Sequence, residues 1–445
     1  MRIVHLLALS LAWGLACHAA FRAGTVALDV SPKQFPVLVN GGMTSRNATG
    51  VTDPLYAKAL VLANGKTEIA IVVVDSCMMP RPMLDEAKNL ASKRTGISSD
   101  RILISATHTH TAPSTLHCLG TKADPRYTPY LMGKIAEAIA TAQQKLQPAQ
   151  AGWNKVNAAE FTALRRWVRR PDRIGIDPFG NPTVRANMHA GRNWDDVTGE
   201  SGPEDPNLTL ISIQDLKGKP LAILANFSMH YFGGVKAVSA DYFGKFATNM
   251  RKMLGADESF VGIMSHGCSG DIWRRDYTLR NWIVDPPPKE EQMQIDSYSK
   301  DLAERTLEGY SKIKHRPNLE LAMAETRMTL KYRTPDVGLL QWAEGIVEEM
   351  GDRNPKNKTE VYAFEQIVLH ERQETEIVLQ ALRIGDIAIT TTPNETYALT
   401  GLKLKAKSPL LNTMVIELAN GGDGYIPPPE QHFLGGYNTW AARSA

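Results

Sequence analysis

Short apolar runs alternate with longer amphipathic segments along most of the chain after residue 25. Thr67 to Val74 is a largely apolar, β-branched run of the kind found in buried strands, and Arg101 to Ala106 is a second one. Between them, the segment from Pro82 to Arg94 has proline at its start and Gly96 just after its end, as helices often do. These three segments predict a β-α-β unit with parallel strands and a right-handed crossover.

The same alternation continues toward the C-terminus. Further helices are expected over residues 130–146, 242–254, 297–313, 338–350 and 396–405. Further strands are expected over residues 208–213, 221–225, 260–264, 319–330, 375–384, 387–389 and 414–418. The pattern predicts an α/β fold with mixed, largely parallel sheets and flanking helices. A length of 445 residues allows two or three domains or one large α/β domain.

Residues 1–20 have a different character. Arg2 precedes the mainly apolar run from Ile3 to Leu15, and small residues follow up to residue 20. This pattern predicts a cleaved signal peptide and a secreted or periplasmic mature protein. The run is shorter than the roughly 20 apolar residues that a membrane anchor needs. A lipoprotein with Cys17 as its lipidated residue is the alternative.

The stretch from residue 165 to residue 206 is rich in Arg, Asp, Gly, Pro and Trp and has no sustained periodicity. About 40 residues of this kind inside a compact domain indicate a functional lid, and a divergent surface insertion is the alternative.

The overall composition is that of an ordinary globular protein, with 43% hydrophobic and 22% charged residues. The formal net charge of +3 is small for this length, which argues against a nucleic-acid-binding protein. After removal of the signal peptide three cysteines remain, so at least one stays unpaired within the chain or pairs outside it.

Several polar residues that could carry chemistry lie just after predicted strands. They are His108, His110, His230, Glu395 and Tyr425. In open parallel sheets the ligand crevice lies outside the carboxyl ends of the strands, so we expect these residues at one rim. Two or three imidazoles and a carboxylate form the ligand set of a catalytic zinc site. Each residue also has a purely structural alternative, such as a buried, hydrogen-bonded His230 or a Glu395 that favours the start of the following helix.

The segment Ser105–Pro113 resembles the S-x-T-H-T-H-S-G-P signature of the neutral/alkaline, non-lysosomal ceramidases. Asn226–His230 is similar to the N-W-x-x-H segment of that family, and Pro393–Thr396 resembles P-x-E-x-T in part. Gly424–Glu430 resembles G-Y-x-x-T-x-E without the threonine. The elements follow in the family's order, so the resemblance implies a single ceramidase-like catalytic domain over residues 21–445.

The resemblance also implies a zinc site and the residues that form it. Zinc would be held by His108, His230, Glu395 and Tyr425. A bound zinc ion lowers the pKa of its water to about 7 and polarises a carbonyl, which suits attack on an amide. His110 and Tyr437 would then move protons or stabilise the developing oxyanion, with packing as the alternative role for Tyr437.

Two departures from the family pattern limit what carries over. The family's essential serine lies in a G-[DN]-x-S-P-N segment, and the matching segment here is Gly270–Arg275. It keeps Asp271, which we count among the expected catalytic residues, but has Trp273 in place of the serine. A tryptophan cannot act as a hydroxyl, so hydrolysis of ceramide in the family's manner is in doubt. The family's C-terminal immunoglobulin-like domain is also missing from this sequence.

The leading hypothesis is a secreted, zinc-dependent amidohydrolase that cleaves an amide in an N-acyl lipid or a related compound. The arginines and tryptophans between residues 165 and 206 favour a polar or anionic substrate over a bare acyl chain. The alternatives are therefore a zinc hydrolase for a carbohydrate or anionic glycoconjugate, and a non-catalytic binding protein on the same fold. We expect no nucleic-acid partner and no transmembrane segment, and the oligomeric state stays open.

Overall fold

The computed structural model of the protein describes residues 21–65, 67–278 and 288–444. The predicted signal peptide, including Cys17, therefore lies outside the described residues. No helix among these residues is both long and apolar enough to cross a lipid bilayer. Within the same ranges Cys77, Cys118 and Cys268 are all free thiols.

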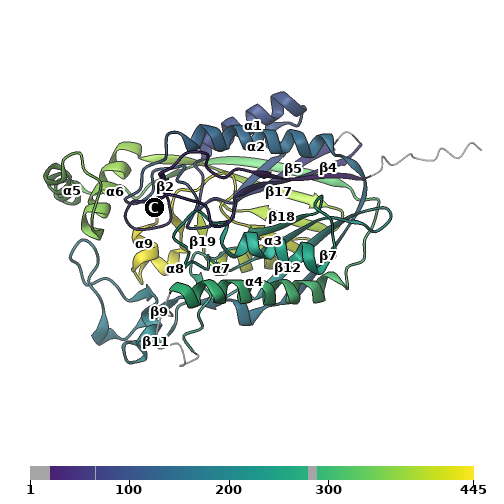
Figure 1. Cartoon of the computed structure of the whole chain (residues 1–445). Helices are drawn as coiled ribbons and strands as arrows, with labels where there is room; N and C mark the ends of the chain where they lie inside the picture. The colour runs from purple at the N-terminus through teal and green to yellow at the C-terminus, as the bar shows by residue number, and fades with distance from the viewer. Residues whose placement is uncertain (1–20, 66, 279–287, 445) are drawn as a thin grey trace, which may run out of the picture.

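In this part of the chain, the largest sheet has eight strands in the order β14-β13-β12-β7-β1-β4-β5-β6, and β4, β5, β7 and β12 are labelled in Figure 1. These strands are β1 (Arg22–Asp29), β4 (Tyr56–Asn64), β5 (Thr67–Val74), β6 (Ile102–Ala106), β7 (Gln147–Asn157), β12 (Asn207–Asp215), β13 (Pro220–Phe227) and β14 (Val261–His266). A second sheet has the order β16-β17-β18-β20. Its strands are β16 (Leu321–Lys331), β17 (Glu374–Ile384), β18 (Ile387–Thr391) and β20 (Asn412–Ile416).

The predicted α/β class with mixed sheets and flanking helices is confirmed, and so is the β-α-β unit, since β5 and β6 pair in parallel. The proportion of parallel strand pairs is smaller than the predicted largely parallel sheets imply. Besides β5–β6, only β13–β14 and β18–β20 are parallel among the described pairs of these two sheets. The middle of the large sheet is antiparallel because β1, β4, β7 and β12 run alternately up and down.

The described helices are α1 (Arg81–Thr95), α2 (Tyr127–Gln144), α3 (Asp241–Met253), α4 (Pro288–Tyr310), α5 (Val337–Met350), α6 (Lys358–Arg372), α7 (Ala398–Lys407), α8 (Pro429–His432) and α9 (Tyr437–Trp440). Six of them, α1, α2, α3, α4, α5 and α7, lie close to the helices predicted from periodicity. Helix α6 was not predicted, and it pairs with α5 in a hairpin at the left of Figure 1.

The fold has three layers: helices, the large sheet and the four-stranded sheet. Successive side chains of a strand point to opposite faces of the large sheet, so each strand contributes to the core on both faces. Val72 and Val74 of β5 face α1 and α2, whereas Ile71 and Val73 face the second sheet. At the other end of the large sheet, Ile223 of β13 packs with α3 and α4. Helices therefore cover one face of the large sheet, and the four-stranded sheet covers the other.

Residues 165–206 contain more order than their composition indicates. Three short strands, β9 (Arg166–Arg169), β10 (Ala186–Met188) and β11 (Val197–Glu200), form a separate sheet at the lower left of Figure 1. Two residues earlier, β8 (Ala163–Leu164) pairs with β15 (Ile272–Trp273). This pairing fixes the start of the segment beside the stretch that follows β14.

Candidate metal centre

The parallel strands are the ones that carry the candidate site. His108 follows β6, His230 follows β13, and Glu395 and Tyr425 follow β18 and β20. A backbone hydrogen bond joins the ends of β20 and β14. The N–H of Glu417, directly after β20, donates to the carbonyl of His266, the last residue of β14, at 3.0 Å. The predicted location at the carboxyl ends of strands is therefore where the structure brings these residues together.

Local backbone contacts set the direction of each side chain. The N–H of His108 donates to Ser76 at 2.8 Å, continuing the β5–β6 ladder past its end, and His108 has a left-handed φ of 73°. Glu395 lies in β19 (Glu395–Thr396), which pairs in parallel with β21 (Tyr425–Ile426) and sets Glu395 opposite Tyr425. A left-handed non-glycine residue is strained and is found most often at functional sites.

Three imidazoles and a carboxylate converge at this point. The Nε2 atom of His108 lies 3.1 Å from Nε2 of His230 and 3.0 Å from Nε2 of His110. Glu395 Oε2 lies 3.3 Å from His108 Nε2 and 3.5 Å from His230 Nε2. His108, His230 and Glu395 form a group able to hold a metal ion, and all three are buried.

The hydrogen bonds of Nδ1 show which ring nitrogen of His108 and of His230 carries the proton. His108 Nδ1 lies 2.8 Å from the Cys77 carbonyl, and His230 Nδ1 lies 3.2 Å from the Ser269 carbonyl. A carbonyl only accepts, so each Nδ1 carries the proton of the neutral ring and each Nε2 presents a lone pair. His110 makes a comparable backbone hydrogen bond with Gly41. The convergent nitrogens are therefore acceptors that face acceptors.

A divalent cation bound between these atoms would relieve this crowding of lone pairs. Glu395 Oε2 is buried and has no hydrogen-bond partner among the described residues. In a tetrahedral zinc site with bonds of about 2.0 to 2.1 Å, ligand atoms lie about 3.3 Å apart. The separations of 3.1, 3.3 and 3.5 Å among His108, His230 and Glu395 fit that spacing.

The charge state of the histidines suits metal binding. Burial holds the pKa of His110 and His230 well below the usual value, and the charges of Arg165 and the neighbouring imidazoles act in the same direction. For His108, burial lowers the pKa, but Glu395, the Cys77 carbonyl and Glu417 together raise it above the usual value. Metal ligation needs the neutral imidazole, which His110 and His230 hold at neutral pH without help.

Cys77 forms a second group with His108 and His110. Its Sγ lies 3.8 Å from His108 Nδ1, the nitrogen that already donates to the Cys77 carbonyl. Burial raises the pKa of the Cys77 thiol well above the usual value, and the Glu395 charge adds to this, which disfavours the thiolate that binds metal. The group with Glu395 is the better metal site.

Tyr425 and Tyr437 lie on one side of Glu395. The Tyr425 hydroxyl accepts a hydrogen bond of 3.0 Å from Arg165 Nη2 and interacts with the Glu395 carboxylate. The Tyr437 ring, at the start of α9, lies 5.7 Å from the Tyr425 ring. Burial raises the pKa of both phenols, and the Glu395 charge adds to the effect.

Asp271 is placed differently from the other predicted site residues. Its Oδ1 accepts the backbone N–H of Ala398, the first residue of α7, at 2.9 Å. Burial raises its pKa to about 6. These contacts give Asp271 a structural role at the helix N-terminus, and a catalytic role for it stays a prediction.

Sequence reasoning did not place two residues around the centre, Glu417 and Arg165. Ser269 Oγ lies 2.7 Å from His266 Nε2 and donates to Glu417 Oε1 at 3.0 Å, forming a buried network behind His230. The signal for Glu417 was a carboxylate inside the apolar run of residues 414–418, directly after β20. Arg165 was predicted only as part of the lid, yet it is 3% exposed and contacts Tyr425.

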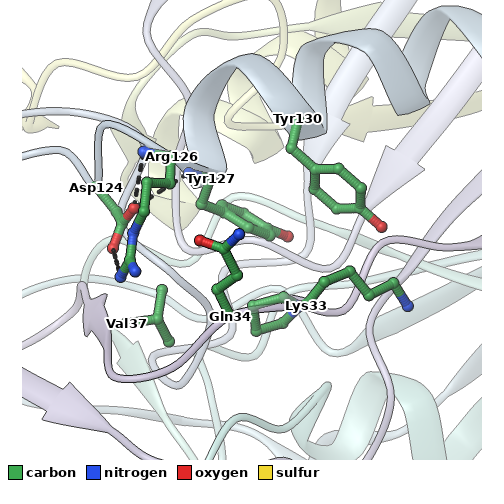
Figure 2. A pocket seen from close by; sticks show the side chains of 8 residues that line it. Lys33, Gln34, Val37, Asp124, Arg126, Tyr127 and Tyr130 are labelled. Atoms are coloured by element: carbon green, nitrogen blue, oxygen red, sulfur yellow. Dashed lines mark hydrogen bonds and ion pairs between the residues drawn. The ribbon is translucent and has the colours of Figure 1, made fainter.

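A separate pocket of about 130 Å³ lies at the N-terminal end of α2 (Figure 2). Within it, Asp124 pairs with Arg126 and accepts the backbone N–H of Leu38 and of Tyr127. None of the predicted site residues lines this pocket. It carries no convergent reactive groups.

No family model and no curated protein matches the chain. Among solved structures it is similar to the neutral ceramidase from Pseudomonas aeruginosa, with a TM-score of 0.67 and 14% identity over 96% of this chain and 71% of that chain. It is also similar to a ceramidase complexed with C2, with a TM-score of 0.68 and 14% identity over 96% of this chain and 72% of that one. The resemblance seen in the sequence motifs is therefore confirmed at the level of the fold, and this chain is a divergent example of the neutral ceramidase architecture.

Proposed function

We propose that the protein is an exported, zinc-dependent hydrolase that cleaves the amide bond of an N-acyl compound. The observation that carries this proposal is the convergence of the His108 and His230 lone pairs on the unpartnered Glu395 oxygen. Tyr425 would complete the ligand set, and residues 165–206 would act as a lid. The fold shared with ceramidases supports hydrolysis of an amide, and the N-terminal sequence supports export.

Zinc bound here would supply a water molecule with a pKa near 7 and would polarise the acyl carbonyl. In the overall reaction the water oxygen bonds to the acyl carbon, the C–N bond breaks, and the amine leaves with a proton. His110 suits the proton transfer, because it is half-buried, neutral and next to His108.

Two further groups suit stabilisation of the developing oxyanion. Tyr437 keeps its hydroxyl proton because burial raises its pKa, so it can donate a hydrogen bond. Arg165 keeps its positive charge, since Tyr425 and Glu395 offset the effect of burial on its pKa. Its charge also favours the phenolate form of Tyr425, the form in which a tyrosine binds zinc.

The test is the variant His108→Ala, compared with His370→Ala, an exposed histidine on α6. We expect about one zinc per wild-type chain, and loss of both zinc and turnover in His108→Ala, because one of so few ligands is removed. Zinc is measured by plasma mass spectrometry and turnover on a panel of ceramide and simpler N-acyl amides. Full zinc content and turnover in His108→Ala would overturn the site.

The same panel separates the alternatives. A non-catalytic binding protein on this fold would turn over no substrate, and its metal content would help to separate it from both hydrolases. A zinc hydrolase for glycoconjugates would leave simple N-acyl amides intact while cleaving a carbohydrate derivative.

A further inference from the structure

A buried carboxylate, that of Glu417, lies behind the proposed metal centre. Glu417 comes directly after β20, and its side chain is fully buried. Its Oε1 accepts the backbone N–H of Ser269 at 3.1 Å and the Ser269 hydroxyl at 3.0 Å. Its Oε2 accepts the backbone N–H of Thr396 at 2.7 Å. One side chain therefore holds together two segments that are far apart in the sequence.

Each of these two segments positions one proposed zinc ligand. The carbonyl of Ser269 lies 3.2 Å from Nδ1 of His230 and accepts its proton. Thr396 directly follows Glu395 in β19. The atoms that would bind zinc, His230 Nε2 and Glu395 Oε2, lie 3.5 Å apart. Their separation therefore depends on how the Ser269 and Thr396 segments are held against each other.

The backbone of the two segments is in close contact as well. The N–H of Gly270 donates to the Thr396 carbonyl at 2.9 Å. A Cβ built on Gly270 would lie 2.7 Å from the carbonyl oxygen of Glu395. Because there is no free space between the segments here, a displacement of the Ser269 segment would be passed on to Glu395.

Ser269, His266 and Glu417 have the composition of a serine hydrolase triad but not its geometry. In a triad the serine and the carboxylate contact opposite nitrogens of the imidazole. Here Ser269 Oγ and Glu417 Oε1 both lie at Nε2 of His266, at 2.7 and 3.1 Å. The Nδ1 atom of His266 has no hydrogen-bond partner among the described residues, and all three side chains are fully buried. The arrangement is that of a support for the centre and not of a nucleophile.

We propose that Glu417 is a positioning residue, which sets His230 and Glu395 at the spacing that zinc requires. It acts through the backbone of Ser269 and Thr396, and each of its two oxygens accepts one buried N–H. A buried N–H without a partner is costly, so loss of either hydrogen bond would make its segment move. This role rests on the zinc site of the proposed function, and it does not require that the substrate is an amide.

The test is the variant Glu417→Gln. Glutamine has one acceptor oxygen where glutamate has two, so either the Ser269 or the Thr396 N–H loses its partner. We expect the dissociation constant for zinc to rise by about 10- to 100-fold, as measured by competition with a chromophoric chelator. The visible absorption of the Co²⁺-loaded variant should also differ from that of wild type, since it reports the geometry of the ligands.

Ser269→Ala separates the backbone contacts from the side-chain contact. It removes the hydroxyl but keeps the N–H that binds Glu417 and the carbonyl that orients His230. Its dissociation constant for zinc should change by less than about threefold. If Glu417→Gln does not fold, Glu417→Asp takes its place, because the shorter side chain keeps the charge but cannot reach both segments.

The matched control is Asp124→Asn. Asp124 is also buried, and its two oxygens accept backbone N–H groups of two segments, at Leu38 and at Arg126 and Tyr127. It lies at the separate pocket of Figure 2. Asp124→Asn should lower stability toward urea as Glu417→Gln does, and it should keep wild-type zinc affinity and the wild-type Co²⁺ spectrum.

The outcomes separate this role from the proposed function. Wild-type zinc affinity and Co²⁺ spectrum in Glu417→Gln would overturn the role of Glu417, and so would an equal loss of zinc affinity in Asp124→Asn. Zinc binding that weakens in Glu417→Gln supports the role even if no amide is cleaved, an outcome that would count against hydrolysis alone. A wild-type protein that takes up no zinc would reject the metal centre and this role together.

Discussion

At the scale of single residues, the candidate metal centre depends on the hydrogen bond that each imidazole makes with the backbone, away from the point where the rings converge. His108, His230 and His110 each have a backbone hydrogen-bond partner, at Cys77, Ser269 and Gly41. Such contacts fix the ring orientation and tautomer of ligating histidines, and their loss typically costs about 10- to 100-fold in metal affinity or activity. The backbone at these positions therefore matters as much as the imidazoles.

Gly41 offers a direct test of this point. Its φ is 103°, and a Cβ built on it would lie 2.5 Å from Cγ of His110. Gly41→Ala should displace the His110 ring and lower kcat/KM by about tenfold or more, in addition to a loss of about 1 kcal/mol in stability from the left-handed backbone.

The matched control is Gly96→Ala, which has a φ of 77° but open space around the new Cβ. It should lose a similar amount of unfolding free energy and keep full activity. Thermal unfolding and initial rates measure the two effects. If both variants kept full activity, the close approach of Gly41 to His110 would have no catalytic importance.

At the scale of elements, the strands and helices with regular patterns could be predicted from the sequence, but apart from the parallel β5–β6 pair their pairing could not. The β5–α1–β6 unit was predicted because its apolar runs and helix ends are clear. Strands β1, β4 and β7 were missed, so the antiparallel middle of the large sheet was missed with them. Pairing depends on contacts between distant segments, which a local pattern does not contain.

The site shows the same division between local pattern and distant contact. Residues that follow strands, such as His108 and Glu395, could be assigned from the sequence, because strand ends gather at one rim. Arg165 could not be assigned, because its neighbours Gly270 and Tyr425 are more than one hundred positions away. Whether such an arginine is buried or solvated is decided only by the folded chain.

Helix α7 gives a prediction that depends on pH. The folded pKa of Asp271, about 6, is above the usual value of 3.8, so the folded state binds this proton more tightly than the unfolded state does. Stability is therefore favoured below about pH 4 and falls by about 3 kcal/mol as pH rises to 6. Asp271→Asn should abolish this fall and keep the contact with Ala398.

Urea unfolding of wild type and Asp271→Asn between pH 4 and 8 measures the difference. Asp336→Asn is the control, because Asp336 accepts the N–H of Leu339 at the start of α5 and is exposed. Parallel pH profiles for wild type and Asp271→Asn would show that the Asp271 carboxyl does not titrate as its burial requires.

At the scale of the whole molecule, one fully buried arginine joins the segment of residues 165–206 to the C-terminal segment. Arg166 donates to the side chain and carbonyl of Gln431, to the Gly435 carbonyl and to the Ala186 carbonyl. Arg166→Leu should cost about 3 to 5 kcal/mol, because several buried acceptors lose their donor. It should also expose residues 165–206 to proteolysis.

Arg170→Leu is the control for this change, because Arg170 is exposed and pairs only with Asp172 among the ion pairs described for it. Its effect on the free energy of unfolding should be much smaller than that of Arg166→Leu, because exposed ion pairs contribute little. Urea unfolding and limited proteolysis compare the two variants. Equal stability of Arg166→Leu and Arg170→Leu would show that the buried arginine does not join the two segments.

The wide spacing of the proposed ligands along the chain has a consequence for how zinc would be acquired. His108 lies in the first quarter of the sequence and Tyr425 in its last tenth, with His230 and Glu395 between them. No nascent or partly folded stretch holds the full set, so tight uptake of the ion has to follow the formation of both sheets. The number of zinc ions per chain in a purified sample would then equal the fraction of natively folded molecules. The ion would be taken from the compartment in which folding is completed.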